Sequence, residues 1–149
     1  MRALIAGLML LLAPSLTWAG DARMLFMAAR TTYPVATGST VYDFEDNTLQ
    51  GWSGGAFAPT GTTPHAGSYC IAGVSGYTQK AITPVSGTLT FWYRSLSAGT
   101  VKVDGATVLA LPDTGNVWTE ASVAITGTVV RFDVTAGSMA LDDISVPTP

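Results

Sequence analysis

The stretch Thr88-Leu89-Thr90-Phe91-Trp92-Tyr93-Arg94 alternates between apolar and polar side chains over most of its length. Because successive side chains of a β-strand point to opposite faces, Leu89 and Phe91 are expected on one face, and Trp92 and Arg94 on the other. The stretch 88–94 is therefore predicted to be a half-buried strand whose Leu89 face is turned toward the core.

Further stretches of this kind lie C-terminal to this strand. Residues 100–103 lead into Asp104-Gly105, a pair typical of two-residue hairpin turns, and residues 106–109 follow it. Other strands, separated by turns that contain glycine, are expected over three ranges: 118–125, 128–134 and 138–146. Strands at intervals of about 8–12 residues, without a helical pattern, predict an all-β fold, an antiparallel β-sandwich of jelly-roll type.

The composition agrees with one β-rich domain. The chain has 149 residues, with 16 glycines, 8 prolines and only 11% charged residues, against about 25% in an average protein. Its net charge is −3 and no lysines or arginines cluster, so we expect no nucleic-acid partner. The single cysteine, Cys70, excludes an internal disulfide and a zinc site made of thiolates.

The N-terminus resembles a secretory signal peptide. Arg2 precedes an apolar run over 4–14, and Ser15-Leu16-Thr17-Trp18-Ala19 then offers small residues at a cleavage point before Gly20. The apolar run is shorter than the roughly 20 residues that span a bilayer. We expect cleavage, a secreted location that is extracellular or periplasmic, and no stable membrane span afterwards. An uncleaved membrane anchor is the alternative.

Four segments are expected along the chain. Residues 1–19 are the predicted signal peptide and residues 20–40 a non-globular N-terminal arm or linker. Residues 41–146 are predicted to form the sandwich. Residues 147–149, Pro-Thr-Pro, are expected to be a tail that leaves the sheet, because proline has no N–H to donate to a neighbouring strand.

Four motifs resemble those of known domains in their order along the chain. The first is Val41-Tyr42-Asp43-Phe44-Glu45-Asp46 with Leu49-Gln50-Gly51-Trp52, which is similar to the "FE…GW" opening of MAM domains and of secreted carbohydrate-binding jelly rolls with a galactose-binding-like β-sandwich. The others are His65-Ala66-Gly67-Ser68-Tyr69, the strand 89–94, and Trp118 with Ala140-Leu141-Asp142-Asp143-Ile144-Ser145-Val146. MAM domains normally carry paired cysteines, which this chain lacks, so the resemblance implies a simplified bacterial or viral relative.

The acidic residues gather at the two ends of the expected sandwich, with Asp43, Glu45 and Asp46 on the first strand and Asp142 and Asp143 on the last. Such strands are often neighbours, and clustered carboxylates repel one another unless a cation neutralises them. Calcium suits such a cluster because it takes 6–8 oxygen ligands. Solvated strand ends, or a carboxylate that accepts only backbone hydrogen bonds, are the alternatives.

The resemblance implies the same ion. Related jelly rolls hold a structural Ca²⁺ through the Glu of "FE", an Asp of "DD" and carbonyls of the histidine turn. The residues implied here are Glu45, Asp142 and the loop His65–Ser68, including Gly67; Asp43 joins them as an expected ligand because it belongs to the acidic cluster. Asp142 shares parity with Ile144, so it is expected to point inward and to need a partner.

The aromatic residues divide into core and candidate ligand residues. Trp52 and Trp118 are expected in the core. Trp92 and Arg94 lie on the polar face of their strand and, with Tyr77, could hold a sugar by stacking and hydrogen bonding. The alternative is that this face packs against the second sheet or a partner subunit.

No catalytic residues are expected. Asp142 and Asp143 are adjacent on a strand, so their carboxylates should point to opposite faces and cannot act as a pair. His65 lies in a turn, the chain contains no G-x-S-x-G elbow, and Cys70 begins an expected strand where a buried thiol is inert.

Two functions remain open. The first is an exported, non-enzymatic binding or adhesion module that recognises a glycan or another cell-surface component. The alternative is a structural assembly subunit on the same jelly roll, such as a virion decoration or an extracellular array protein, whose partners would be neighbouring subunits.

Overall fold

The computed structural model describes residues 32–149. The predicted signal peptide 1–19 and the first part of the predicted arm, up to residue 31, lie outside the described residues. All regular elements of the described part are strands: β1 (Gly38–Tyr42), β2 (Phe57–Thr60), β3 (Cys70–Ser95), β4 (Gly99–Val103), β5 (Ala106–Leu111) and β6 (Thr119–Thr148).

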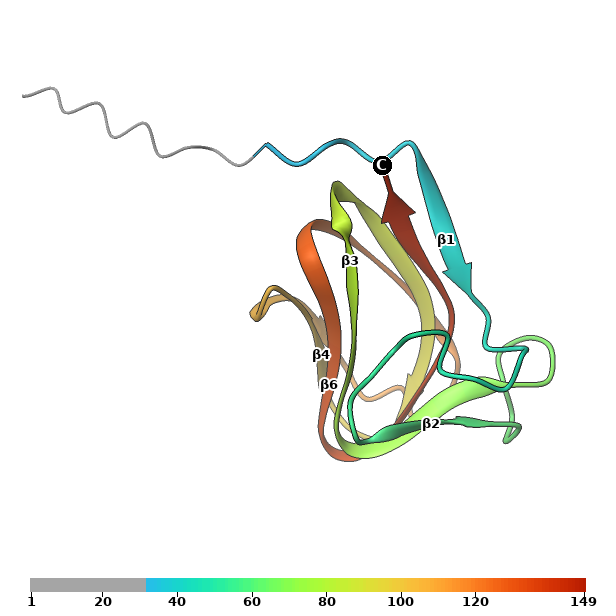
Figure 1. Ribbon diagram of the computed structural model, residues 1–149. Coiled ribbons are helices and arrows are strands. Elements are labelled where there is room, and N and C mark those ends of the chain that lie inside the picture. The colour runs from blue at the N-terminus through green and yellow to red at the C-terminus, as the bar shows by residue number, and fades with distance from the viewer. Residues whose placement is uncertain (1–31) are drawn as a thin grey trace, which may run out of the picture. The chain divides into compact units, whose positions relative to one another are not determined.

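Two long strands, β3 and β6, organise the sheet. They pair antiparallel from Ile71 opposite Leu141 to Tyr93 opposite Thr119, and the end of β3 pairs a second time with the end of β6, from Thr90 opposite Ser145. Both strands bend (Figure 1), and the double pairing folds the sheet over on itself. The result is an antiparallel β-sandwich, which confirms the predicted fold class.

The shorter strands extend this framework. β2 pairs with β3, β4 pairs with β6, β5 pairs with β4, and β1 pairs with the end of β6. The turn between β4 and β5 is Asp104-Gly105, with φ of 48° and 85°. Both residues have the positive φ that a type I′ hairpin requires, so the expected hairpin is confirmed.

The core lies on the predicted face of the strand 88–94. Leu89, Phe91 and Tyr93 are buried, whereas Trp92 and Arg94 are partly exposed. The ring of Phe132 from β6 lies 4.8 Å from that of Phe91 and 5.5 Å from that of Trp52, measured between centroids. Trp52 is buried, as expected, and these rings join the two layers.

The ends of the domain lie together at one edge. Gly38 pairs with Thr148, and the Thr37 N–H donates to the Thr148 carbonyl at 2.9 Å. The prediction that residues 147–149 leave the sheet is wrong for Pro147 and Thr148, which belong to β6. Proline is tolerated there because each ladder has positions at which the N–H is not used. The prediction of a non-globular arm over 20–40 is wrong for its last residues, because β1 begins at Gly38 and the Ala36 N–H donates to the Ser86 carbonyl at 2.8 Å.

Candidate functional site

The loop 61–69, between β2 and β3, crosses the polar side of the strand 88–94. The His65 ring stacks on Trp92, with centroids 3.8 Å apart and 13° between the planes. Arg94 Nη2 donates to the Thr62 carbonyl at 2.9 Å, and Trp118 Nε1 donates to a neighbouring loop carbonyl at 3.2 Å. One stacked pair and two hydrogen bonds therefore fasten the loop to Trp92, Arg94 and Trp118.

Asp142 lies beneath this loop and is 1% exposed, so its expected burial is confirmed. The predicted inward orientation is wrong, because Asp142 pairs with Trp92 and therefore lies on the polar face that the loop covers. Its Oδ2 accepts from the backbone N–H groups of His65, at 2.9 Å, and Ala66, at 3.4 Å, while its Oδ1 accepts from the Asp143 N–H at 2.9 Å. Burial raises the pKa of Asp142 to about 6, although the three N–H donors oppose that shift.

Asp143 corrects the expectation that adjacent carboxylates face opposite ways. Its Oδ2 lies 2.8 Å from His65 Nδ1, so both carboxylates contact the same histidine. Asp143 has φ of 47°, and the pairing shifts between Trp92 opposite Asp142 and Thr90 opposite Ser145. One extra residue on β6 is therefore accommodated in a β-bulge, which interrupts the side-chain alternation.

Glu45, which follows β1, fastens the other end of the loop. Its carboxylate accepts from the N–H groups of Ser68, at 2.8 Å, and Tyr69, at 3.0 Å. Gly67 has φ of 58°, and a Cβ at this position would overlap the Glu45 carboxylate. Glycine is thus required at 67 both for the backbone conformation and for the approach of Glu45.

Asp43 does not join this arrangement. It is exposed, and its Oδ1 accepts from Gln50 Nε2 at 3.0 Å and from the Glu45 N–H at 3.3 Å. The hydrogen bond from Gln50, followed by that from the Glu45 backbone, lowers the pKa of Asp43.

Four of the five expected calcium residues thus meet at the loop 61–69: Glu45, His65, Gly67 and Asp142. The oxygen chemistry fits calcium, since two carboxylates accept hydrogen bonds from a loop whose backbone carbonyls are further oxygen donors for the ion. However, N–H groups face both carboxylates in this arrangement, and residues 32–149 contain no group of three or more His, Cys, Asp or Glu side chains able to hold a metal. Calcium binding stays a prediction that requires the loop peptides to turn.

Trp92 and Trp118 do not have the surroundings predicted from the sequence. One face of Trp92 is covered by His65. Trp118 was expected in the core but is partly exposed, just before β6. Its ring lies edge-on to that of His65, with centroids 5.8 Å apart, and the Arg94 guanidinium lies 5.3 Å from the ring centroid. Both tryptophans therefore support the loop rather than forming an open platform.

Tyr77 lies elsewhere, within a separate cluster that we call the charged face: Tyr77, Lys102, Arg131 and Asp133. The Arg131 guanidinium lies 3.8 Å from the centre of the Tyr77 ring. Asp133 accepts from Arg131 Nε at 2.9 Å and lies 3.3 Å from Lys102 Nζ. Burial would raise the pKa of Asp133, but the hydrogen bonds from Arg131 and Lys102 outweigh it and lower that pKa.

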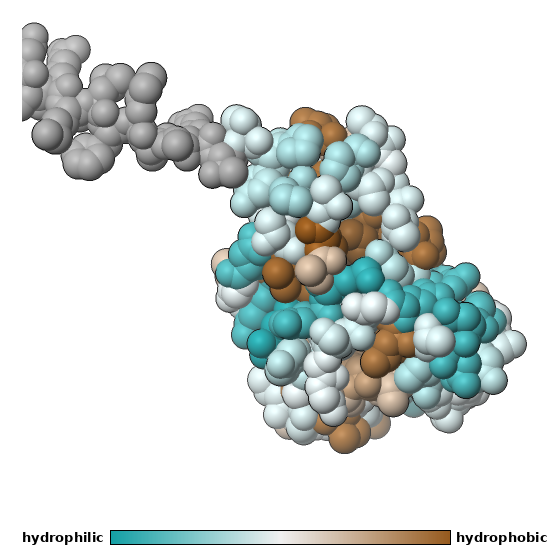
Figure 2. All heavy atoms as spheres, viewed as in Figure 1, coloured by the Kyte–Doolittle hydropathy of each residue, from teal (hydrophilic) through white to brown (hydrophobic). Residues whose placement is uncertain are grey.

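Of this face, only Tyr77 was predicted from the sequence. The alternation of charged and apolar residues could have identified the others. Lys102 lies between Val101 and Val103, and Arg131 and Asp133 lie on either side of Phe132. In such a pattern the charged side chains share the outer face of neighbouring strands. Figure 2 shows hydrophilic residues gathered in a band across one side of the domain, between more hydrophobic patches.

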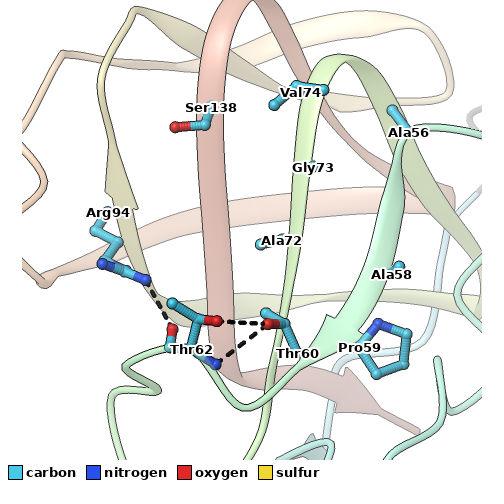
Figure 3. A pocket seen from close by; sticks show the side chains of 10 residues that line it. All are labelled: Ala56, Ala58, Pro59, Thr60, Thr62, Ala72, Gly73, Val74, Arg94 and Ser138. Atoms are coloured by element: carbon cyan, nitrogen blue, oxygen red, sulfur yellow. Dashed lines mark hydrogen bonds between the residues drawn. The ribbon is translucent and has the colours of Figure 1, made fainter.

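A pocket of about 410 Å³ opens beside the loop (Figure 3). It is lined by ten residues, most of them small: Ala56, Ala58, Pro59, Thr60, Thr62, Ala72, Gly73, Val74, Arg94 and Ser138. Arg94 is the one charged side chain in this lining.

Burial raises the pKa of the Cys70 thiol to about 11, with the Asp142 charge adding to the effect, so the thiol stays protonated. Among the described residues, no helix is long and apolar enough to span a bilayer.

Comparison with known proteins finds likeness only at the level of three-dimensional structure. No protein-family model and no curated protein matches the chain. The K2 cleaved adhesin domain of Lys-gingipain matches with a TM-score of 0.63 and 14% identity, over 74% of this chain and 99% of that one.

Carbohydrate-binding modules match as well. The CBM22-1 xylan-binding domain of Paenibacillus barcinonensis Xyn10C has a TM-score of 0.56 and 14% identity, over 76% of this chain and 96% of that one. A point mutant of the family 29 carbohydrate-binding module CBM29-2 has a TM-score of 0.56 and 11% identity, over 74% of this chain and 90% of that one. At these identities the likeness shows the fold alone: the chain has the β-sandwich fold that is also found in carbohydrate-binding modules and an adhesin domain.

Proposed function

We propose that the chain is an exported, non-enzymatic module that binds glycans on a surface. The charged face is the observation that carries this proposal. It combines an aromatic ring, Tyr77, with donors and acceptors that are held in fixed positions by one another. The solved structures of the same fold support it, because they include modules described as carbohydrate-binding and xylan-binding, and a domain described as an adhesin.

The charged face suits the chemistry of sugars. A sugar presents many hydroxyl groups, each of which can both donate and accept, so it binds best to fixed, planar polar groups beside an aromatic surface. Arg131 supplies several donors, Lys102 supplies an ammonium group, and Asp133 accepts. Because these side chains already hold one another, little conformational entropy is lost when a sugar arrives.

The groups that could act in catalysis are engaged elsewhere. His65, Asp142 and Asp143 fasten the loop 61–69, through a ring nitrogen and backbone N–H groups. Cys70 is buried and its raised pKa keeps it protonated. These observations support a binding role without a reaction.

The charged face is tested by glycan-array screening of the full chain and of the variants Arg131→Ala and Tyr77→Ala. We expect the wild type to bind one class of glycan, and both variants to lose at least about tenfold in affinity, since each removes a well-placed contact. Arg131→Lys keeps the charge but not the planar fork, so it should retain part of the binding. Glu120→Ala, an exposed carboxylate outside the charged face, should bind like the wild type.

Binding that survives Arg131→Ala and Tyr77→Ala alike would contradict this site. An array on which the wild type binds no glycan would contradict the function itself.

We also propose a structural calcium ion between Glu45, Asp142 and the carbonyls of the loop 61–69. Its support is the burial of Asp142, which forms no ion pair with a lysine or arginine within residues 32–149. A buried carboxylate without a cationic partner is costly, and a divalent ion bound there would neutralise it. The ion would hold the loop and take no part in a reaction.

Export distinguishes the proposed glycan-binding module from the alternative, a structural assembly subunit. We expect the chain recovered from a secreting host to begin at Gly20 and to have the native mass of a monomer. N-terminal sequencing and native mass spectrometry measure both properties. A chain that keeps Met1 within a large assembly would instead support a subunit whose partners are its neighbours.

A further inference from the structure

The floor of the pocket beside the loop 61–69 lies over four neighbouring strand segments. Ala58 of β2 pairs with Ala72 of β3, which pairs with Ala140 of β6, and Ala140 pairs in turn with Arg94 at the end of β3. Ala58, Ala72 and Arg94 line the pocket of about 410 Å³ (Figure 3). This volume falls within the range of about 300–1,000 Å³ that is usual for sites of small ligands.

Polar groups stand around this floor. Thr60 and Thr62 lie on the side of the loop, and Ser138 lies across the floor from them (Figure 3). Thr60 and Thr62 contact each other through their hydroxyls at 3.1 Å, so these side chains are fixed before a ligand arrives. The pocket therefore offers hydroxyl groups on opposite sides of an apolar surface.

Arg94 gives the pocket a positive charge that no neighbour neutralises. Within residues 32–149 its guanidinium forms no ion pair, whereas Arg131 and Lys102 share Asp133. Its Nη1 donates to Asn116 Oδ1 at 3.1 Å and its Nη2 to the Thr62 carbonyl at 2.9 Å. Both acceptors are neutral, so they fix the guanidinium without cancelling its charge.

We propose that this pocket binds a sugar that carries a carboxylate, such as a uronic acid unit of an acidic glycan. Arg94 would donate charge-assisted hydrogen bonds to the carboxylate. The hydroxyls of Thr60, Thr62 and Ser138 would bind those of the sugar, whose less polar ring face would lie on the alanine floor. A single guanidinium binds one carboxylate, so one uronic acid unit of the glycan would occupy the pocket.

This site is separate from the charged face and does not rest on glycan binding there. The test uses isothermal titration calorimetry of the full chain in a buffer with EDTA, with trigalacturonate as the acidic probe and galactotriose as its neutral counterpart. We expect the wild type to bind trigalacturonate at least about tenfold more tightly than galactotriose.

Two variants address the pocket. Arg94→Gln removes the positive charge, and Ser138→Asp adds a negative charge while leaving the contacts of Arg94 in place. Each should weaken the binding of trigalacturonate at least about tenfold. Val41→Asp is the matched control, because it adds the same charge at a residue that is 56% exposed and does not line the pocket; it should bind like the wild type.

Wild-type chain that does not prefer trigalacturonate overturns the proposal, and so does an equal effect of Ser138→Asp and Val41→Asp. Loss of trigalacturonate binding in Arg131→Ala, with full binding in Ser138→Asp, also overturns it and assigns the acidic sugar to the charged face. Because Ser138→Asp keeps the loop contacts of Arg94, a folding defect of Arg94→Gln leaves the test intact.

Discussion

Replacing Asp142 by alanine should lower the free energy of unfolding by about 3 kcal/mol, measured in EDTA so that only the hydrogen bonds contribute. The substitution leaves three backbone N–H groups, those of His65, Ala66 and Asp143, without their acceptor beneath the loop. Each buried donor that loses its partner costs about 1–3 kcal/mol, and water that enters at the loop recovers part of this. Urea unfolding, followed by tryptophan fluorescence, measures the change.

The position of the loss separates this mechanism from a general weakening of the sandwich. Amide hydrogen exchange in Asp142→Ala should accelerate at His65 and Ala66, and should stay slow at Phe91 in the core. Glu120→Ala, which removes an exposed carboxylate opposite Trp92, should change the stability by less than about 0.5 kcal/mol. A similar loss in both variants would show that the buried carboxylate does not fasten the loop.

Calcium added to EDTA-treated protein should raise the melting temperature by several degrees. An ion that binds only the folded state stabilises it by about 2.7 kcal/mol when its concentration is a hundred times its Kd. In a domain of this size, 1 kcal/mol corresponds to about 4 °C. Differential scanning calorimetry with and without calcium chloride gives the shift.

Two controls make the calcium result specific. Magnesium chloride should have little effect, because Mg²⁺ is smaller and loses its water reluctantly. Asp142→Asn keeps the size of the side chain and removes its charge, so the calcium shift should disappear. A melting temperature that calcium leaves unchanged in the wild type would eliminate the ion and leave the hydrogen bonds and the His65–Trp92 stack to fasten the loop.

The strand pattern was readable from the sequence because alternation has a direct physical cause. The buried Leu89, Phe91 and Tyr93, and the partly exposed Trp92 and Arg94, follow from the period of a strand with one face on the core. The same reasoning failed for Asp142, which is buried by the loop 61–69 on the face of Trp92 and not by the core.

The arrangement of the site was harder to predict, because it depends on local backbone geometry and on a loop. The bulge at Asp143 reverses the expected direction of one carboxylate, and aspartate is one of the few residues that adopt such a φ easily. The stacking of His65 on Trp92 joins positions from a loop and a strand that no periodicity connects. The sequence also did not show that Tyr77 lies apart from Trp92. The two residues belong to the same strand, β3, but this strand bends between them and contributes to both layers of the sandwich.

The pairing of Gly38 with Thr148 has a mechanical consequence. The chain enters β1 and leaves β6 at the same end of one antiparallel ladder, which Figure 1 shows at the edge of the domain. A pulling force applied between residues 37 and 148 would act across the ladder rather than along it. The hydrogen bonds between β1 and β6 would then open one after another from that end, so tension would peel β1 away before it strained the aromatic core.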